Sequence, residues 1–142
     1  MLQINIKDTL LIVLPILTAI LGSFFTYIFS MKEKKLDTVR KFKEEKYTNL
    51  ILLLQSFIGY TVSGDGKKKF FEESYKSWLY CSDNVTKSIN NFIDFISGET
   101  GLIKDTTKGH ELIGKIILEM RKDLLGKTKL SIADFKYVSV TD

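Results

Sequence analysis

The sequence predicts an all-α protein in which one N-terminal transmembrane helix precedes a cytoplasmic bundle of about four helices. Three observations lead to this prediction. Residues 9–31 are 23 consecutive positions without a charged side chain. Beyond them, apolar residues recur at the three- and four-residue spacing of amphipathic helices. Glycine-containing stretches separate these helical segments from one another.

The uncharged stretch has the length of a membrane span. A helix of 23 residues rises about 34 Å, and the hydrocarbon core of a bilayer is roughly 30 Å thick. A cleavable signal peptide is one alternative, but its apolar region usually ends at a small-residue cleavage site, which residues 29–32 do not provide. A buried core helix is another, although so long an uncharged stretch is unusual in a 142-residue chain. We therefore expect an uncleaved anchor.

The distribution of basic residues predicts the orientation of this span. Lys7 is the only basic side chain ahead of it, whereas seven follow it up to residue 46. Because cytoplasmic flanks of membrane helices are rich in Lys and Arg, we expect the N-terminus outside and the C-terminal domain in the cytoplasm, at the cell (inner) membrane. The single Cys81 is consistent with a reducing compartment.

These observations divide the chain into four predicted segments. Residues 1–8 are a short extracytoplasmic N-terminus and residues 9–31 the transmembrane helix. Residues 32–49 are a charged juxtamembrane helix, and residues 50–142 a helical cytoplasmic domain.

One face of the span carries small side chains. Thr18, Gly22 and Thr26 are four residues apart, so they stack on one side of a helix and would let two backbones approach closely. Such spacing also arises by chance, because Gly, Ser and Thr are common in membrane helices. A homo-oligomer through this face is one prediction, and a pore lined by its hydroxyl groups is a sharper one. The predicted association surface comprises Pro15, Thr18, Ala19, Gly22, Ser23 and Thr26.

The segment after the span is strongly charged. Between residues 31 and 46 there are seven basic and four acidic side chains, as on a solvated helix face. Basic residues next to a membrane are also attracted to anionic lipid, by roughly 1 kcal/mol each. The interleaved acidic residues argue against nucleic-acid binding. The predicted lipid contacts are Lys32, Lys34, Lys35, Arg40 and Lys41.

The remaining chain predicts the helices of the bundle. Helices are expected over residues 50–60, 67–80, 83–98 and 110–125, with glycine-containing loops over residues 62–66 and 97–109. The second has an aromatic face that includes Phe70, Phe71, Tyr75, Trp78 and Leu79. Gly126 is expected to terminate the last helix, residues 131–134 to form a capping box, and residues 138–140 to be extended.

Residues with catalytic potential are sparse. His110 is the only histidine and Cys81 the only cysteine, so no metal site of familiar spacing is expected. The glycine-rich stretch before Lys67 lacks the spacing of a phosphate-binding loop and reads as a surface turn. We therefore expect no enzymatic activity, no cofactor and no metal.

Short motifs between residues 78 and 135 resemble a known group of proteins. They are Trp78-x-x-Cys-Ser-Asp83-x-Val85, the stretch from Met120 to Gly126, and Leu130-Ser131-x-x-Asp134-Phe135. Together they resemble a loose group of uncharacterised bacterial and phage-borne membrane proteins with a helical domain. This chain departs from that pattern by one additional leucine before Gly126. The resemblance implies a prokaryotic inner-membrane setting and no activity, and it makes Arg121 and Asp123 candidates for a shared role.

Two functions are consistent with these features. The first is a membrane-tethered interaction or regulatory module whose bundle contacts a cytoplasmic protein. Its predicted partner surface comprises Phe70, Phe71, Trp78, Arg121 and Asp123. The alternative is a small oligomerising effector, toxin- or defence-like, that perturbs the bilayer. For Arg121 and Asp123, a structural role at the end of the last helix is favoured over partner binding.

Overall fold

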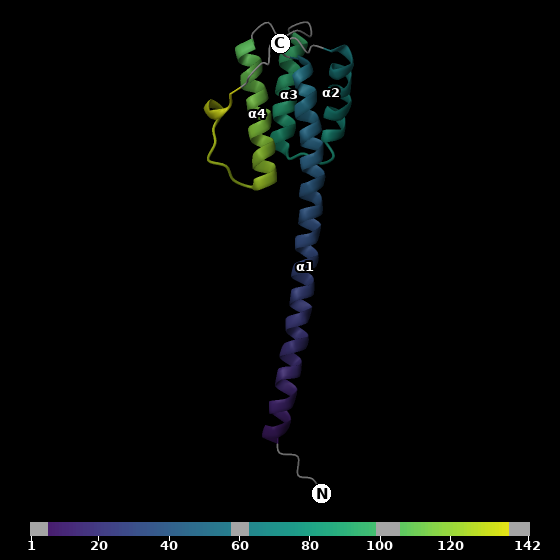
Figure 1. Ribbon diagram of the computed structural model, residues 1–142, viewed down its shortest axis with the longest axis vertical. Coiled ribbons are helices and arrows are strands. Elements are labelled where there is room, and N and C mark those ends of the chain that lie inside the picture. The colour runs from purple at the N-terminus through teal and green to yellow at the C-terminus, as the bar shows by residue number, and fades with distance from the viewer. Residues whose placement is uncertain (1–5, 58–62, 99–105, 137–142) are drawn as a thin grey trace, which may run out of the picture. The chain divides into compact units, whose positions relative to one another are not determined.

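The computed structural model describes residues 6–57, 63–98 and 106–136, which are helical apart from turns and irregular segments and contain no strand. The predicted extended stretch at residues 138–140 lies outside the described residues. Within these three ranges, two short 3₁₀ helices accompany four α-helices (Figure 1). In chain order the elements are α1 (Ile6–Leu54), η1 (Gln55–Phe57), α2 (Gly64–Ser77), α3 (Asp83–Gly98), α4 (Thr106–Leu125) and η3 (Ile132–Asp134).

The chain divides into two compact units, residues 1–40 and residues 41–142, and α1 contributes to both. The predicted juxtamembrane helix over residues 32–49 and the first part of the helix predicted over residues 50–60 belong to α1, which has no break between them. The helix assignment also continues through Pro15.

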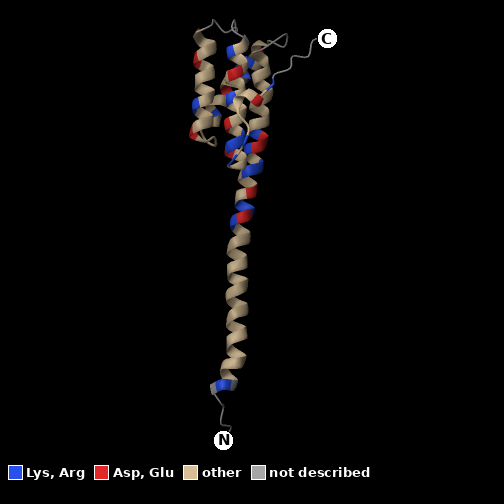
Figure 2. Cartoon of the chain, turned by 90° about the vertical axis from the view of Figure 1, so that its left-hand side faces the viewer, with Lys and Arg blue, Asp and Glu red and all other residues tan. Residues whose placement is uncertain are grey.

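In the first unit, the described part of α1 presents its side chains to the surroundings. None of residues 9–31 is buried, and Figure 2 shows this long stretch of α1 without basic or acidic residues. Its most apolar window has a mean hydropathy of 2.2, with none of it buried. By length and composition this helix could cross a membrane.

The second unit is a helical bundle. Residues 41–54 of α1 lie beside α2, α3 and α4 (Figure 1), and α3 packs along α4. The ring of Phe57 lies at the centre of the aromatic contacts in the core. It packs edge-to-face on Phe70 and Phe92, with centroid distances of 5.0 and 5.4 Å. The buried apolar residues are Tyr47, Leu50, Leu54, Phe57, Phe70, Val85, Ile89, Phe92, Ile96, Ile113, Ile116 and Met120.

The periodicity of α3 determines its buried face. Val85, Ile89, Phe92 and Ile96 are spaced by four, three and four residues and are all buried. The sequence predicts a stripe of Val85, Ile89, Phe92, Ile93 and Ile96, which is confirmed except at Ile93, whose side chain is half-buried. The sequence also predicts that the last helix buries Leu112, Ile113, Ile116, Ile117, Met120 and Leu124. Ile113, Ile116 and Met120 are buried, and the other three are half-buried.

Helix α2 begins earlier than predicted. Gly64 and Gly66, expected in a loop, lie in its first turn, because Ser63 caps the helix by accepting a hydrogen bond from the Gly66 amide at 3.3 Å. A side chain at position 66 would collide with Ser56, whose Cβ lies 2.7 Å from the place that a Cβ would occupy. Glycine is therefore needed here for close packing of α2 on η1, and it does not break the helix.

Helix α4 begins earlier than predicted, whereas its predicted end and the predicted capping box after it are confirmed. The helix begins at Thr106, four residues before the predicted start. It ends at Leu125 and is followed by Gly126, whose φ of 77° is readily adopted by glycine and whose amide donates to the Lys122 carbonyl at 2.7 Å. Asp134 accepts hydrogen bonds from the amide and hydroxyl of Ser131, both at 2.8 Å, which completes the predicted capping box.

Candidate functional site

The small-residue face of the span lies on a fully helical part of α1. The hydroxyl groups of Thr18, Ser23 and Thr26 donate to carbonyl oxygens one turn back, at 3.1, 2.8 and 2.8 Å. A Cβ at Gly22 would meet no atom within 4 Å. The polar groups of this face are thus satisfied inside their own helix, and its surface is small and largely apolar. Pro15 and Ala19 are exposed on the same helix.

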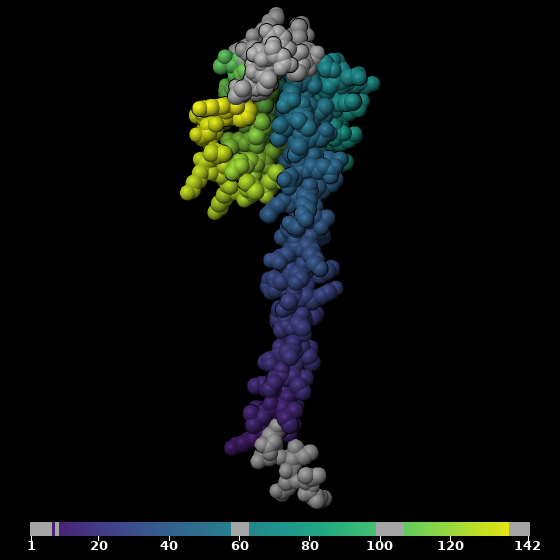
Figure 3. Space-filling view, in the orientation of Figure 1, coloured from purple at the N-terminus to yellow at the C-terminus, as the bar shows by residue number. Residues whose placement is uncertain are grey.

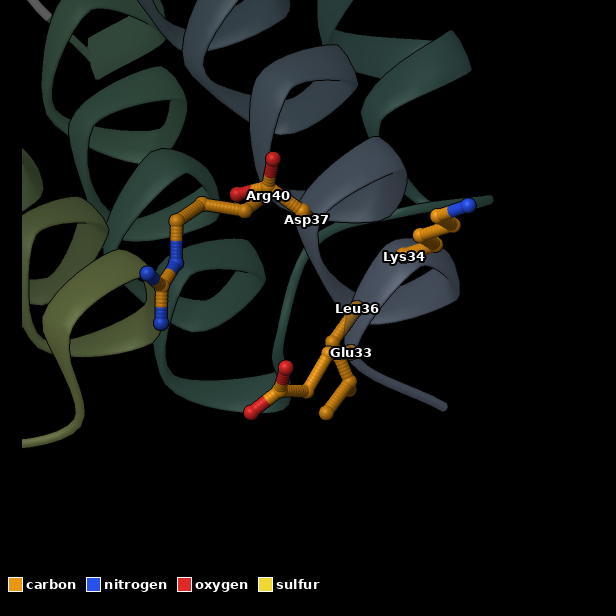
Figure 4. A pocket seen from close by; sticks show the side chains of 5 residues that line it. All are labelled: Glu33, Lys34, Leu36, Asp37 and Arg40. Atoms are coloured by element: carbon orange, nitrogen blue, oxygen red, sulfur yellow. The ribbon is translucent and has the colours of Figure 1, made fainter. Parts of the chain in front are cut away.

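The predicted lipid-contact residues Lys32, Lys34, Lys35, Arg40 and Lys41 are all exposed on α1. Five neighbouring side chains border an open hollow, and Figure 4 shows that they spread apart instead of converging on one point. They are Glu33, Lys34, Leu36, Asp37 and Arg40. Because one helix cannot surround a small ligand, this hollow is a region of charged surface and no enclosed site.

The aromatic residues predicted on one face of α2 do not share one environment: Phe70 faces the core, whereas Tyr75, Trp78 and Leu79 face outward. Phe70 is fully buried, so it contributes nothing to a partner surface. Ser74 and Ser77 continue the buried face because their small side chains fit a close contact and donate to the carbonyls of Phe71 and Ser74. Phe71 is half-buried. The exposed members of the predicted face are Tyr75, Trp78 and Leu79, with 76%, 64% and 89% of their surface accessible.

A polar cluster joins α1 to α4 within the bundle. The Asp123 carboxylate accepts hydrogen bonds from the Lys43 ammonium at 2.7 Å and the Tyr47 hydroxyl at 2.5 Å. The Lys43 and Asp123 side chains are only 20% and 13% exposed. Burial, reinforced by the hydrogen bond to Asp123, raises the pKa of Tyr47 far above its ordinary value of 10.0. Tyr47 is therefore a neutral donor at every physiological pH.

Cys81 lies beside this cluster. Burial raises the pKa of its thiol, while hydrogen bonds with Tyr47 and Ser77 act in the opposite direction. A raised pKa keeps the thiol protonated and weakly nucleophilic. Burial likewise raises the pKa of Tyr80, whose ring packs edge-to-face on Phe42 at 5.6 Å between centroids. These side chains hold the turn between α2 and α3 against α1.

The two polar candidates at the end of α4 have different surroundings. Arg121 is exposed, and its Nε donates to the Thr128 hydroxyl at 3.2 Å in the segment that follows α4. Asp123 belongs to the half-buried cluster with Lys43 and Tyr47. Its partners are 80 and 76 residues away along the chain, and the sequence offers no signal that pairs them. Sequence reasoning therefore missed Lys43 and Tyr47.

Two hollows lie on the bundle surface. A groove of about 370 Å³ runs between α3 and α4 and is lined by Asn84, Lys87, Ser88, Asn91, Lys115, Glu119 and Lys122. A smaller hollow of about 120 Å³ lies where the segment after α4 returns along that helix (Figure 3), with Phe135 packed over Gly114. The first is polar and carries three lysines; the second is small and mostly apolar.

Within the described ranges, no three His, Cys, Asp or Glu side chains gather in a way that could hold a metal ion. His110 lies half-buried near the start of α4. No protein-family model, curated protein or solved structure matches this chain.

Proposed function

We propose that this protein is a membrane-tethered helical module without catalytic activity, which presents its bundle to a protein partner at the cytoplasmic face of a prokaryotic inner membrane. One observation carries the proposal. A charge-free helical stretch with no buried side chain is joined to a bundle that has its own compact core. Apolar surface of that extent requires a covering in water, and a bilayer covers it at the matching length.

The flanking charges support the proposed orientation. Seven basic residues follow the span within residues 32–46, against Lys7 before it. Reducing conditions on the cytoplasmic side would also keep the unpaired Cys81 as a thiol.

The polar cluster of the bundle supports binding over catalysis. Lys43, Tyr47 and Asp123 direct their hydrogen bonds at one another, and the raised pKa of Tyr47 makes its hydroxyl a poor acid or base at neutral pH. Such a cluster joins two helices more readily than it activates a substrate.

The groove between α3 and α4 is the surface that best fits a protein partner. Lys87, Lys115 and Lys122 outnumber Glu119, which pairs with Lys122 at 2.6 Å. The amides of Asn84 and Asn91 add hydrogen-bonding groups that both donate and accept. Its net positive charge complements an acidic polypeptide segment.

Purification of the tagged full-length protein from its host membranes in mild detergent tests this proposal. We expect a second polypeptide to co-purify, and Lys87→Glu with Lys115→Glu to release it. The matched control is Lys68→Glu with Lys69→Glu, which reverses two exposed lysines on α2. Purification of a single polypeptide under all conditions would contradict the recruiting function.

The second candidate is an oligomeric membrane effector. It is favoured by the satisfied hydroxyl groups of Thr18, Ser23 and Thr26, since a small face without free polar groups suits close helix packing. The same bonds make a hydroxyl-lined pore less suitable than a dry interface. Gly22→Ile should abolish self-association in a membrane two-hybrid reporter and relieve growth arrest on overexpression. Ile20→Phe adds bulk on the opposite face and serves as the control. Unchanged assembly and growth with Gly22→Ile would refute this candidate.

A further inference from the structure

The turn between α2 and α3 lies at the end of the bundle where α1 enters it. Phe42, near the first residue of the bundle, contacts Tyr80 of the turn with ring centroids 5.6 Å apart. Lys43 reaches Asp123 near the end of α4 at 2.7 Å. One end of the bundle therefore brings together the entry of α1, the α2–α3 turn and the C-terminal end of α4.

This end carries a protruding apolar tip, which we define as Tyr75, Trp78 and Leu79. Their accessible fractions of 76%, 64% and 89% are high for side chains of this size. The exposure follows from an ordered turn, because the amides of Leu79, Tyr80 and Cys81 donate to carbonyls of Lys76 and Ser77 at 2.8–3.1 Å. The next residues, Tyr80 and Cys81, turn back toward the core.

Exposed cations after α4 lie at the same end of the bundle as the tip, where the exposed Glu72 and Asp83 also flank it along the chain and Glu73 pairs with Lys76 at 2.6 Å. Residues 119–129 contain four basic and two acidic side chains, and both acidic ones are paired with lysines, Glu119 with Lys122 and Asp123 with Lys43. Arg121, Lys127 and Lys129 are exposed. Figure 2 shows basic residues, interleaved with acidic ones, at this end of the bundle. An amphipathic aromatic tip beside exposed cations has the composition that favours the headgroup region of anionic bilayers.

The short segment between the span and the bundle favours a lipid surface as the binding partner of the tip. If residues 9–31 cross a membrane, as proposed above, residue 41 follows the end of the span by ten residues. These ten residues belong to the unbroken helix α1 and rise about 15 Å, which keeps this end of the bundle within reach of the headgroups. Three exposed side chains are too few for a stable protein interface, but tethering makes a weak contact effective.

We propose that the tip of Tyr75, Trp78 and Leu79 inserts into the headgroup region of the anionic bilayer that anchors the chain, and that exposed cations after α4 contact lipid phosphates. This inference rests on the proposed membrane anchoring. It assigns to lipid a surface that the sequence associates with a protein partner. The contact fixes which end of the bundle faces the membrane, and it leaves the groove between α3 and α4 accessible to the partner.

The test uses Trp78, the only tryptophan of the chain, as an intrinsic reporter. The full-length protein is reconstituted into bilayers of phosphatidylcholine alone and into bilayers that also contain phosphatidylglycerol. With phosphatidylglycerol we expect Trp78 emission to shift to shorter wavelength, quenching by aqueous iodide to fall at least twofold, and quenching by brominated acyl chains to appear.

Variants sharpen this test. Leu79→Asp should reverse all three changes, whereas Leu52→Asp, the same substitution at an exposed leucine of α1, should leave them intact. Lys127→Glu with Lys129→Glu should remove the dependence on phosphatidylglycerol. If Trp78 remains equally open to iodide in both bilayers while the protein floats with them, the inference is refuted and the anchoring survives.

Two further outcomes would also overturn the inference. A chain that does not float with vesicles would refute the proposed anchoring together with the tip contact. Shielding of Trp78 in native membranes but in no pure lipid bilayer would assign the tip to a protein instead.

Discussion

Helix α1 contains two apolar stretches that differ in what covers them. Residues 9–31 are apolar around the whole helix and none is buried, whereas residues 47–54 bury Tyr47, Leu50 and Leu54 on one side. The second stretch has the three- and four-residue spacing that a helix needs to face a core, and the first has no polar face. Hydrophobicity alone therefore does not determine burial in the fold; the period of the pattern does.

The largest expected effect comes from charging the first stretch. Leu17→Arg with Ile20→Arg should remove the protein from the membrane fraction, because each arginine near the centre of a span costs about 2.5–3.5 kcal/mol of insertion free energy. The bundle should keep its circular dichroism spectrum and unfolding midpoint, since neither residue belongs to its core. Alkaline extraction of membranes measures the change, with Leu17→Ile and Ile20→Leu as the control. Continued resistance to extraction would mean that this stretch is no anchor.

A core truncation in the second stretch should have the next largest effect. Leu50 is fully buried, so Leu50→Ala should lower the free energy of unfolding by about 2–5 kcal/mol. Leu52, two residues away and 57% exposed, provides the matched control, and Leu52→Ala should have little effect. Urea denaturation of the protein in detergent measures both. Equal losses for the two variants would contradict the observed face of α1.

Substitutions of three glycines should change stability by smaller amounts and again distinguish packed from open positions. Gly66→Ala should destabilise the bundle by about 1–3 kcal/mol because a Cβ there overlaps Ser56. Gly64→Ala lies in the same first turn of α2 with open space around it, and Gly22→Ala is equally open in the first stretch. Thermal unfolding should separate the first variant from the other two. A stable Gly66→Ala protein would show that α2 and Ser56 are farther apart.

The smallest expected effect is a pH dependence confined to the bundle. The folded state keeps Tyr47 and Cys81 protonated to higher pH than their ordinary values of 10.0 and 9.0. The unfolded chain then releases these protons first, so the contribution of these two groups to stability should be constant at neutral pH and fall as the pH rises above about 8. Urea midpoints between neutral and alkaline pH measure this fall, which should be shallower in Tyr47→Phe. Identical slopes in the two proteins would exclude Tyr47 as a contributor.

The extent to which the sequence predicts the structure differs between α3 and α2. In α3 the apolar stripe is regular and the buried side was predicted correctly. In α2 the aromatic residues suggested the wrong side, because serines occupy two of its three buried positions. Small polar residues whose hydroxyls bond the preceding turn can pack as closely as apolar ones, which a hydrophobicity pattern does not reveal.

By itself the sequence determined the helical class, the charge-free stretch, the stop at Gly126 and the capping box at Ser131, since each depends on residues within a few positions of one another. Only the tertiary structure decided that Lys43 and Tyr47 meet Asp123, and that Trp78 lies outside while Phe70 lies inside. These contacts join segments up to 80 residues apart. Helix periodicity carries no information about which distant faces pack together, and that choice is made when the whole core closes.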